Sequence, residues 1–135
     1  MKRTVEQNRN TMKFENGLTL TEGQKYSGHI DRDTNEKCGY GIQVWPDGSK
    51  YEGFWHEDKA KGFGRFILAD GDVYQGEWIE DKAHGQGEYF YAEGATYKGG
   101  WIEDKQEGNG REEWPDGSYY EGKYLRGKKH GKGLF

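Results

Sequence analysis

The stretch YEGFWHEDKAKGFGRFI, residues 51–67, contains the pattern from which the fold of this chain can be predicted. Aromatic residues and glycines alternate in it with a spacing of two, first in Tyr51-x-Gly53-x-Trp55 and again in Gly62-x-Gly64-x-Phe66. This spacing is the period of a β-strand, although glycine is a poor strand former because it has no side chain to pack. We therefore interpret the stretch as two strands of a hairpin whose glycines and rings share one face.

The same pattern recurs every 23 residues, with tyrosines at 51, 74, 97 and 120 as its markers. Each unit reads as Tyr-x-Gly-x-Trp, a loop of the type EDKAKG, a second strand Gly-x-Gly-x-aromatic, and a turn such as PDGS or ADGD. Asp-Gly between two strands is a strong hairpin signal. Where proline precedes it, as at 46–49, we predict a type I turn with the glycine in the left-handed region.

A single sheet has no second layer to cover its rings, so the rings need another partner. We predict that they lie across the glycine backbone of a neighbouring strand, where no side chain obstructs them. The predicted fold class is all-β, an elongated single-layer twisted antiparallel meander of stacked β-hairpins. Its opposite face varies between units, which is typical of a solvated surface.

The repeat divides the chain into a basic N-terminal tail, residues 1–12, and one repeat domain, residues 13–135. Within the domain we predict a half unit, four units and a partial unit, at 13–25, 26–50, 51–73, 74–96, 97–119 and 120–135. The first unit is irregular: it is two residues longer and carries Ile30 where the next three units carry tryptophan and the last carries Tyr124.

Amino-acid composition and charge distribution argue against two classes, disordered chains and nucleic-acid-binding proteins. The hydrophobic fraction is 31% and the mean hydropathy is −1.24, but aromatic residues make up 16% of the chain, which argues against disorder. The net charge of −4 comprises +3 in residues 1–13, +4 in 119–135 and −11 between them. An acidic middle disfavours nucleic-acid binding. A single cysteine and the absence of a leader or long apolar run lead us to expect a cytoplasmic protein.

The units resemble the MORN repeat (membrane occupation and recognition nexus), most closely in YQGEWIEDKAHGQG (74–87) and YEGKYLRGKKHGKG (120–133). The resemblance implies a rod of antiparallel hairpins and a role as a cytoskeletal, ciliary or membrane-junction adaptor. It also implies an alternative function, a phosphoinositide- or anionic-phospholipid-binding membrane module such as the regulatory MORN region associated with phosphatidylinositol phosphate kinases. The chain departs from the family where Asp58, Asp81 and Asp104 replace a turn glycine. Aspartate is among the few residues that tolerate a positive φ, so we expect the turn to survive.

No arrangement of residues in the sequence indicates catalysis, a metal or a cofactor. His84 and His130 occupy the same repeat position two units apart, and Cys38 has no base placed near it. The recurring EDK loops place acidic residues along one edge, together with Lys59, Lys82 and Lys105, which we expect to offset their charge. We interpret that edge as solvated, with a surface for a basic partner and a cation site as alternatives. The chain is therefore predicted not to be an enzyme.

Two binding surfaces follow from the repeat. The first is a groove for a protein partner, a peptide or helix, over the aromatic face; its predicted residues are Tyr51, Trp55, Tyr74, Trp78, Tyr91, Tyr97, Trp101 and Trp114. The second is a site for anionic phospholipid such as phosphoinositide at the basic end, with Lys123, Arg126, Lys128, Lys129 and Lys132. The open edges of the sheet also suggest an end-to-end homodimer.

Overall fold

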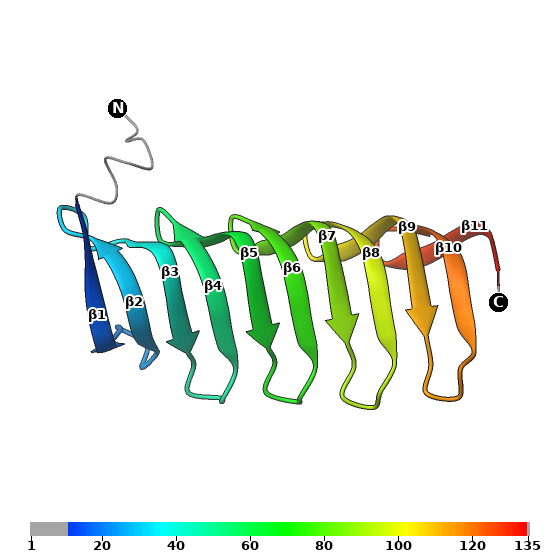
Figure 1. The fold of residues 1–135 in the computed structure, drawn as a ribbon, viewed down its shortest axis with the longest axis horizontal. Coiled ribbons are helices and arrows are strands. Elements are labelled where there is room, and N and C mark those ends of the chain that lie inside the picture. The colour runs from blue at the N-terminus through cyan, green and yellow to red at the C-terminus, as the bar shows by residue number, and fades with distance from the viewer. Residues whose placement is uncertain (1–10, 135) are drawn as a thin grey trace.

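A computed structural model describes residues 11–134 of the chain, apart from the side chains of Lys132 and Leu134. The predicted N-terminal tail therefore lies largely outside the described residues. Eleven antiparallel strands form one open sheet in sequence order, with no helical element among the described residues (Figure 1), which confirms the predicted fold class. The strands are β1 Met12–Thr19, β2 Lys25–Asp31, β3 Lys37–Val44, β4 Lys50–His56, β5 Lys59–Ile67, β6 Val73–Ile79, β7 Lys82–Phe90, β8 Thr96–Ile102, β9 Lys105–Glu113, β10 Tyr119–Leu125 and β11 Lys128–Leu134.

The first strand of each unit pairs with the second in a register that keeps one face aromatic. In the hairpin of β4 and β5, Gly53 pairs with Gly64 and Trp55 pairs with Ala60. The backbone from Ala60 to Gly64 is longer than the backbone it faces, and a bulge absorbs the difference at Gly62, which has φ +90°. The bulge leaves Ala60, Gly64 and the rings on the same face.

The turn that joins these two strands is shorter than the sequence suggests. We expected a loop of the type EDKAKG, but β5 begins at Lys59 and only Glu57 and Asp58 lie outside the strands. Their φ angles are +47° and +73°, the combination that a tight type I′ turn requires. Aspartate tolerates this conformation as predicted. The predicted loop was too long. Glutamate is not associated with positive φ, yet it occupies the first position of this turn, so the sequence did not indicate a two-residue turn.

The turns between units have the predicted form. Gly48 has φ +93° and donates its N–H to the Trp45 carbonyl at 3.0 Å, which is a type I turn followed by a left-handed glycine. The Asp47 carboxylate accepts hydrogen bonds from the backbone N–H and hydroxyl of Ser49. These two hydrogen bonds lower the pKa of Asp47 and hold the turn closed.

The core is one row of rings, packed edge-to-face on a single face of the sheet. The tyrosine ladder comprises Tyr26, Tyr51, Tyr74, Tyr97 and Tyr120, each at most 4% exposed. At Gly110 an added Cβ would lie 2.5 Å from the Tyr97 ring, which confirms that the glycines make room for the rings. Tyr97 also donates its hydroxyl to the Gly100 carbonyl at 3.0 Å, so the buried oxygen has a partner.

Tryptophans connect one unit to the next across this core. The Trp78 indole N–H donates to the Gly64 carbonyl at 3.0 Å, and its ring meets Tyr51 edge-to-face at 5.3 Å between centroids. Edge-to-face pairs of this kind stabilise beyond the area they bury. The repeat therefore supplies, within one layer, the packing that most folds obtain from two layers.

Candidate functional site

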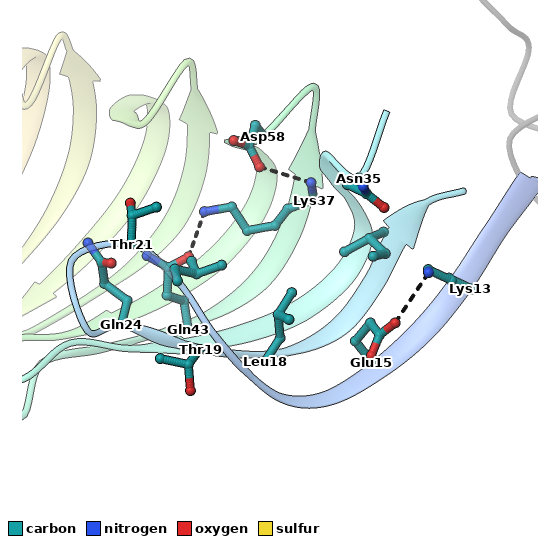
Figure 2. A pocket seen from close by; sticks show the side chains of 12 residues that line it. Lys13, Glu15, Leu18, Thr19, Thr21, Gln24, Asn35, Lys37, Gln43 and Asp58 are labelled. Atoms are coloured by element: carbon teal, nitrogen blue, oxygen red, sulfur yellow. Dashed lines mark hydrogen bonds and ion pairs between the residues drawn. The ribbon is translucent and has the colours of Figure 1, made fainter. Parts of the chain in front are cut away.

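The aromatic face forms the floor of a groove that follows the long axis of the rod. Figure 2 shows the strands curved around the side chains on this face at its N-terminal end. Six of the eight predicted groove residues, the tyrosines at 51, 74 and 97 and the tryptophans at 55, 78 and 101, are at most 8% exposed. These rings form the buried core. They therefore support the floor of the groove and contribute little accessible surface to it. Tyr91 and Trp114 are half-buried.

Other half-buried rings provide most of the accessible groove surface. Trp45, Phe66 and Tyr89 pack against the core and remain partly exposed. Sequence reasoning did not include them among the site residues. The position of Phe66 and Tyr89 holds Glu112 in the next unit, so it is not aromatic throughout, whereas Trp45 was omitted although it corresponds to Tyr91 and Trp114. Their place at the end of each second strand, just before the turn, was the signal that could have identified them.

Two neighbouring cavities lie along the middle of the groove. One of about 360 Å³ is lined by residues that include Ala60, Phe66, Trp78 and Asp81. The next, of about 320 Å³, is lined by residues 23 positions further on, among them Ala83, Tyr89, Trp101 and Asp104. At these two cavities the second strand of one unit thus contributes a small residue and a ring, and the following unit contributes a tryptophan and an aspartate.

A lysine occupies the corresponding place at the N-terminal end of the groove. Lys37 is the counterpart of Ala60, and its Nζ lies 4.2 Å from the centroid of the Trp55 ring. The same Nζ donates to Gln43 Oε1 at 2.6 Å (Figure 2). Burial lowers the pKa of Lys37, while Asp58 and Asp81 act in the opposite direction. The adjoining cavity of about 580 Å³ is bounded on its other side by β1 residues such as Leu18.

The acidic edge predicted from the EDK loops is partly structural. The Asp81 carboxylate accepts the backbone N–H of Ala60 at 2.7 Å, and Asp104 does the same for Ala83. The lysines of the EDK motif lie on the other face: Lys82 pairs with Ile79 in the register, one position away from the buried Trp78–Ala83 pair. The aspartates therefore line the groove without the lysines beside them in the sequence, which corrects our expectation that lysine offsets their charge there.

The predicted lipid-binding residues do not all have the same surroundings. Lys123, Arg126 and Lys128 are exposed. Lys129 lies 4.0 Å from a Glu112 oxygen and over the Tyr120 ring at 5.1 Å, so its charge has partners within the chain. The side chain of Lys132 lies outside the described residues.

The described side chains form no metal-binding cluster and no activated thiolate. Among residues 11–134, as far as their side chains are described, no three histidine, cysteine, aspartate or glutamate residues form a group able to hold a metal ion. Burial raises the pKa of the Cys38 thiol, with Asp31 and Glu36 acting in the same direction, which disfavours the nucleophilic thiolate. The described residues also contain no helix long and apolar enough to cross a membrane.

Comparison with known proteins agrees with the repeat seen in the sheet. A family model described as MORN repeat matches residues 35–50, 51–73, 74–96, 97–119 and 120–135. A search of curated proteins found no match. The structure extends the sheet beyond the matched residues, because β1 and β2 precede residue 35 and continue the same antiparallel order. With five repeats matched across residues 35–135 and a sheet that follows their period, the chain belongs to the MORN repeat family.

Proposed function

We propose that the chain is a non-catalytic, cytoplasmic scaffold that binds a segment of a partner protein in its aromatic groove, within a cytoskeletal, ciliary or membrane-junction assembly. The observation that carries the proposal is the pair of neighbouring cavities, 360 and 320 Å³, lined by the half-buried rings of Phe66 and Tyr89. Partly exposed aromatic side chains in well-packed surroundings are the residues that dominate protein-binding energy.

The rigidity of the floor supports the same function. Trp78 and Trp101 are held by indole hydrogen bonds to Gly64 and Gly87 and by edge-to-face contacts with the tyrosine ladder. A surface that is already ordered loses little conformational entropy when a partner binds. The groove therefore meets the requirement for a specific site although the sheet has only one layer.

Selection from a displayed peptide library tests the groove directly. We expect selected peptides to lose at least about tenfold in affinity for Phe66→Ser and Leu68→Ser, because both side chains line the 320 Å³ cavity and both are partly accessible. Phe63→Ser is the matched control, since Phe63 directly precedes the core-facing Gly64, therefore lies on the opposite face, and is 54% exposed. Peptides that bind all three variants equally would place the binding surface elsewhere and contradict the proposal.

A phospholipid-binding module is the second candidate. The exposed Lys123, Arg126 and Lys128 near the last strand favour it, because each basic residue close to an anionic membrane contributes about 1 kcal/mol. Co-sedimentation with phosphoinositide-containing liposomes at two salt concentrations tests it. Salt-sensitive binding lost in Lys128→Glu would support the module, and no sedimentation with any liposome would exclude it.

Assembly through the sheet edges is proposed as well. β1 and β11 are the outermost strands of the described sheet, and each leaves one side of its backbone without a neighbouring strand. Such edges favour strand pairing, so an end-to-end homodimer is the expected form. A light-scattering mass equal to one chain at high concentration would exclude it.

A further inference from the structure

The groove consists of equivalent positions, one for each unit, whose occupants differ. Each position combines four residues from two successive units. Two come from the second strand of one unit, the first near its start and the other six residues later. The other two come from the next unit: the aromatic residue of its first strand and a residue of the turn after that strand. The first position has Lys37, Gln43, Trp55 and Asp58, the second has Ala60, Phe66, Trp78 and Asp81, the third has Ala83, Tyr89, Trp101 and Asp104, and the fourth has Gln106, Glu112, Tyr124 and Gly127.

The first position already contains a cation. The Lys37 ammonium lies 4.2 Å from the Trp55 ring centroid, well within the roughly 6 Å range of a cation–π interaction. Figure 2 shows the lysine extended along the groove toward Gln43, with Asp58 beside its backbone. Lys37 thus shows which chemistry this kind of position accommodates: an alkyl stem along the floor of the groove and a positive charge over an indole ring.

The far end of the groove contains a second ammonium from the chain itself. Lys129 lies 5.1 Å from the Tyr120 ring centroid, 5.4 Å from that of Trp114, and 4.0 Å from a Glu112 oxygen. Aromatic rings and a carboxylate again surround a lysine. Both ends of the groove are therefore filled with positive charge by the chain.

The two central positions have alanine where the first position has lysine. Ala60 and Ala83 are buried, and beside them lie the cavities of 360 and 320 Å³. Each cavity has a tryptophan on its floor and an aspartate on its wall. Asp81 and Asp104 each accept one backbone N–H, and a carboxylate with four lone-pair sites keeps capacity for further donors.

Charge around the central positions is mainly negative, with Asp58, Asp81 and Asp104 lining the two cavities. No lysine or arginine is among the described residues that line the 320 Å³ cavity, and Lys37 is the one basic residue described around the 360 Å³ cavity. The turns between units, at 46–49, 69–72, 92–95 and 115–118, contain acidic residues and no basic ones. A cationic ligand therefore meets complementary charge along the middle of the groove.

We propose that the two central positions each receive a lysine or arginine side chain of the partner segment, with its charge over Trp78 or Trp101 and against Asp81 or Asp104. This inference rests on the proposed function and specifies its partner. Equivalent positions are two strands apart, which is about 9.4–9.8 Å. A polyproline II segment places every third residue on one side at about 9.3 Å, so the recognised sequence is basic-x-x-basic in that conformation.

The test uses the full chain and a synthetic peptide, Pro-Pro-Lys-Pro-Pro-Lys-Pro-Pro, followed by NMR. We expect the indole N–H signals of Trp78 and Trp101 to shift on titration, and the same peptide with glutamate in place of both lysines not to bind. The double variant Ala60→Lys/Ala83→Lys places lysine side chains of the chain itself in both central positions, as Lys37 occupies the first position. This double variant is expected to weaken peptide binding at least about tenfold, whereas Lys59→Ala, on the other face, leaves it unchanged.

A second variant tests the inference without adding side chains to the core. Lys37→Ala opens the first position, so a longer peptide with three lysines at the same spacing should bind this variant more tightly than the natural chain. Equal affinity of the two-lysine peptide for the natural chain and a folded Ala60→Lys/Ala83→Lys variant would overturn the inference, as would unchanged affinity of the three-lysine peptide for Lys37→Ala.

The library selection separates failure of this inference from failure of the proposed function. Selected peptides that lack basic residues but lose affinity for Phe66→Ser would overturn the basic-ligand inference and leave the groove function in place. Peptides that bind without dependence on any groove residue would overturn both.

Discussion

Asp81 binds Ala60 across a gap of 21 residues: its carboxylate accepts the Ala60 backbone N–H at 2.7 Å, and its own N–H donates to the Ala60 carbonyl at 3.1 Å. The turn of one hairpin is therefore attached to the second strand of the hairpin before it. Asp104 makes the same pair of hydrogen bonds with Ala83. Because these contacts join successive units, they couple the repeats of the rod in addition to the sheet hydrogen bonds.

Asp81→Ala should destabilise the fold by about 1–3 kcal/mol, because it leaves the Ala60 N–H without its acceptor and places alanine at φ +69°. Urea unfolding followed by tryptophan fluorescence measures the change. Asp81→Asn, which retains an acceptor oxygen and tolerates positive φ, should lose less than half as much. Equal losses in the two variants would show that the carboxylate contact is not the cause.

Gly64→Ala should destabilise by about 2–3 kcal/mol, since its Cβ would lie 2.5 Å from a carbon of the Tyr51 ring, which is less than 2% exposed and cannot move aside. The measurement is the urea midpoint together with near-ultraviolet circular dichroism of the rings. Arg65→Ala, one residue away on the exposed face, is the control and should change stability by less than about 0.5 kcal/mol. A stable Gly64→Ala protein would contradict the ring-over-glycine packing.

Stability should fall as the pH rises above about 10. Burial raises the pKa of Tyr26, Tyr51, Tyr74 and Tyr97 in the folded chain, whereas unfolded tyrosine loses its proton near pH 10. Above that pH the unfolded state binds fewer protons than the folded state, so the free energy of unfolding decreases. Below about pH 9 these four groups contribute no pH dependence, because both states keep their protons.

Urea unfolding at pH 8, 10 and 11 measures this dependence. Tyr74→Phe removes one of the four groups and should reduce the slope above pH 10, although it also removes the hydrogen bond to the Glu77 carbonyl. An unfolding free energy that stays constant from pH 8 to 11 would contradict the tyrosine contribution.

Trp78→Ala should destabilise by about 3–5 kcal/mol, since the ring is 8% exposed and contacts Tyr51, Phe66 and Tyr74. Loss of partner binding in this variant would therefore follow from loss of folding and would say little about the groove. Thermal unfolding distinguishes the two: we expect Phe66→Ser to shift the midpoint much less than Trp78→Ala. Similar shifts would mean that Phe66 belongs to the core and not to the groove surface.

The period, the hairpins and the core were predictable from residue spacing alone. The recurrence of Tyr-x-Gly-x-Trp every 23 residues specifies both strand alternation and the contact between a ring and a glycine, because both depend on local spacing. The turn at Asp47 and Gly48 was predictable for the same reason, since its chemistry lies within four residues. The family resemblance rests on these same residues.

The contacts between units and the accessible surface were not predictable, because they depend on how the strands align in three dimensions. The tight Glu57–Asp58 turn shifted the start of β5 and placed Ala60 on the core face, and no local signal marks glutamate for positive φ. The equivalent Glu80–Asp81 turn directs Asp81 to the previous unit and Lys82 to the opposite face, although they are neighbours in sequence. Lys37 reaches Trp55 only because stacking brings strands of successive units together. Contacts between units depend on how the bulges and twist align the strands, and that alignment cannot be predicted from the spacing of residues within one unit.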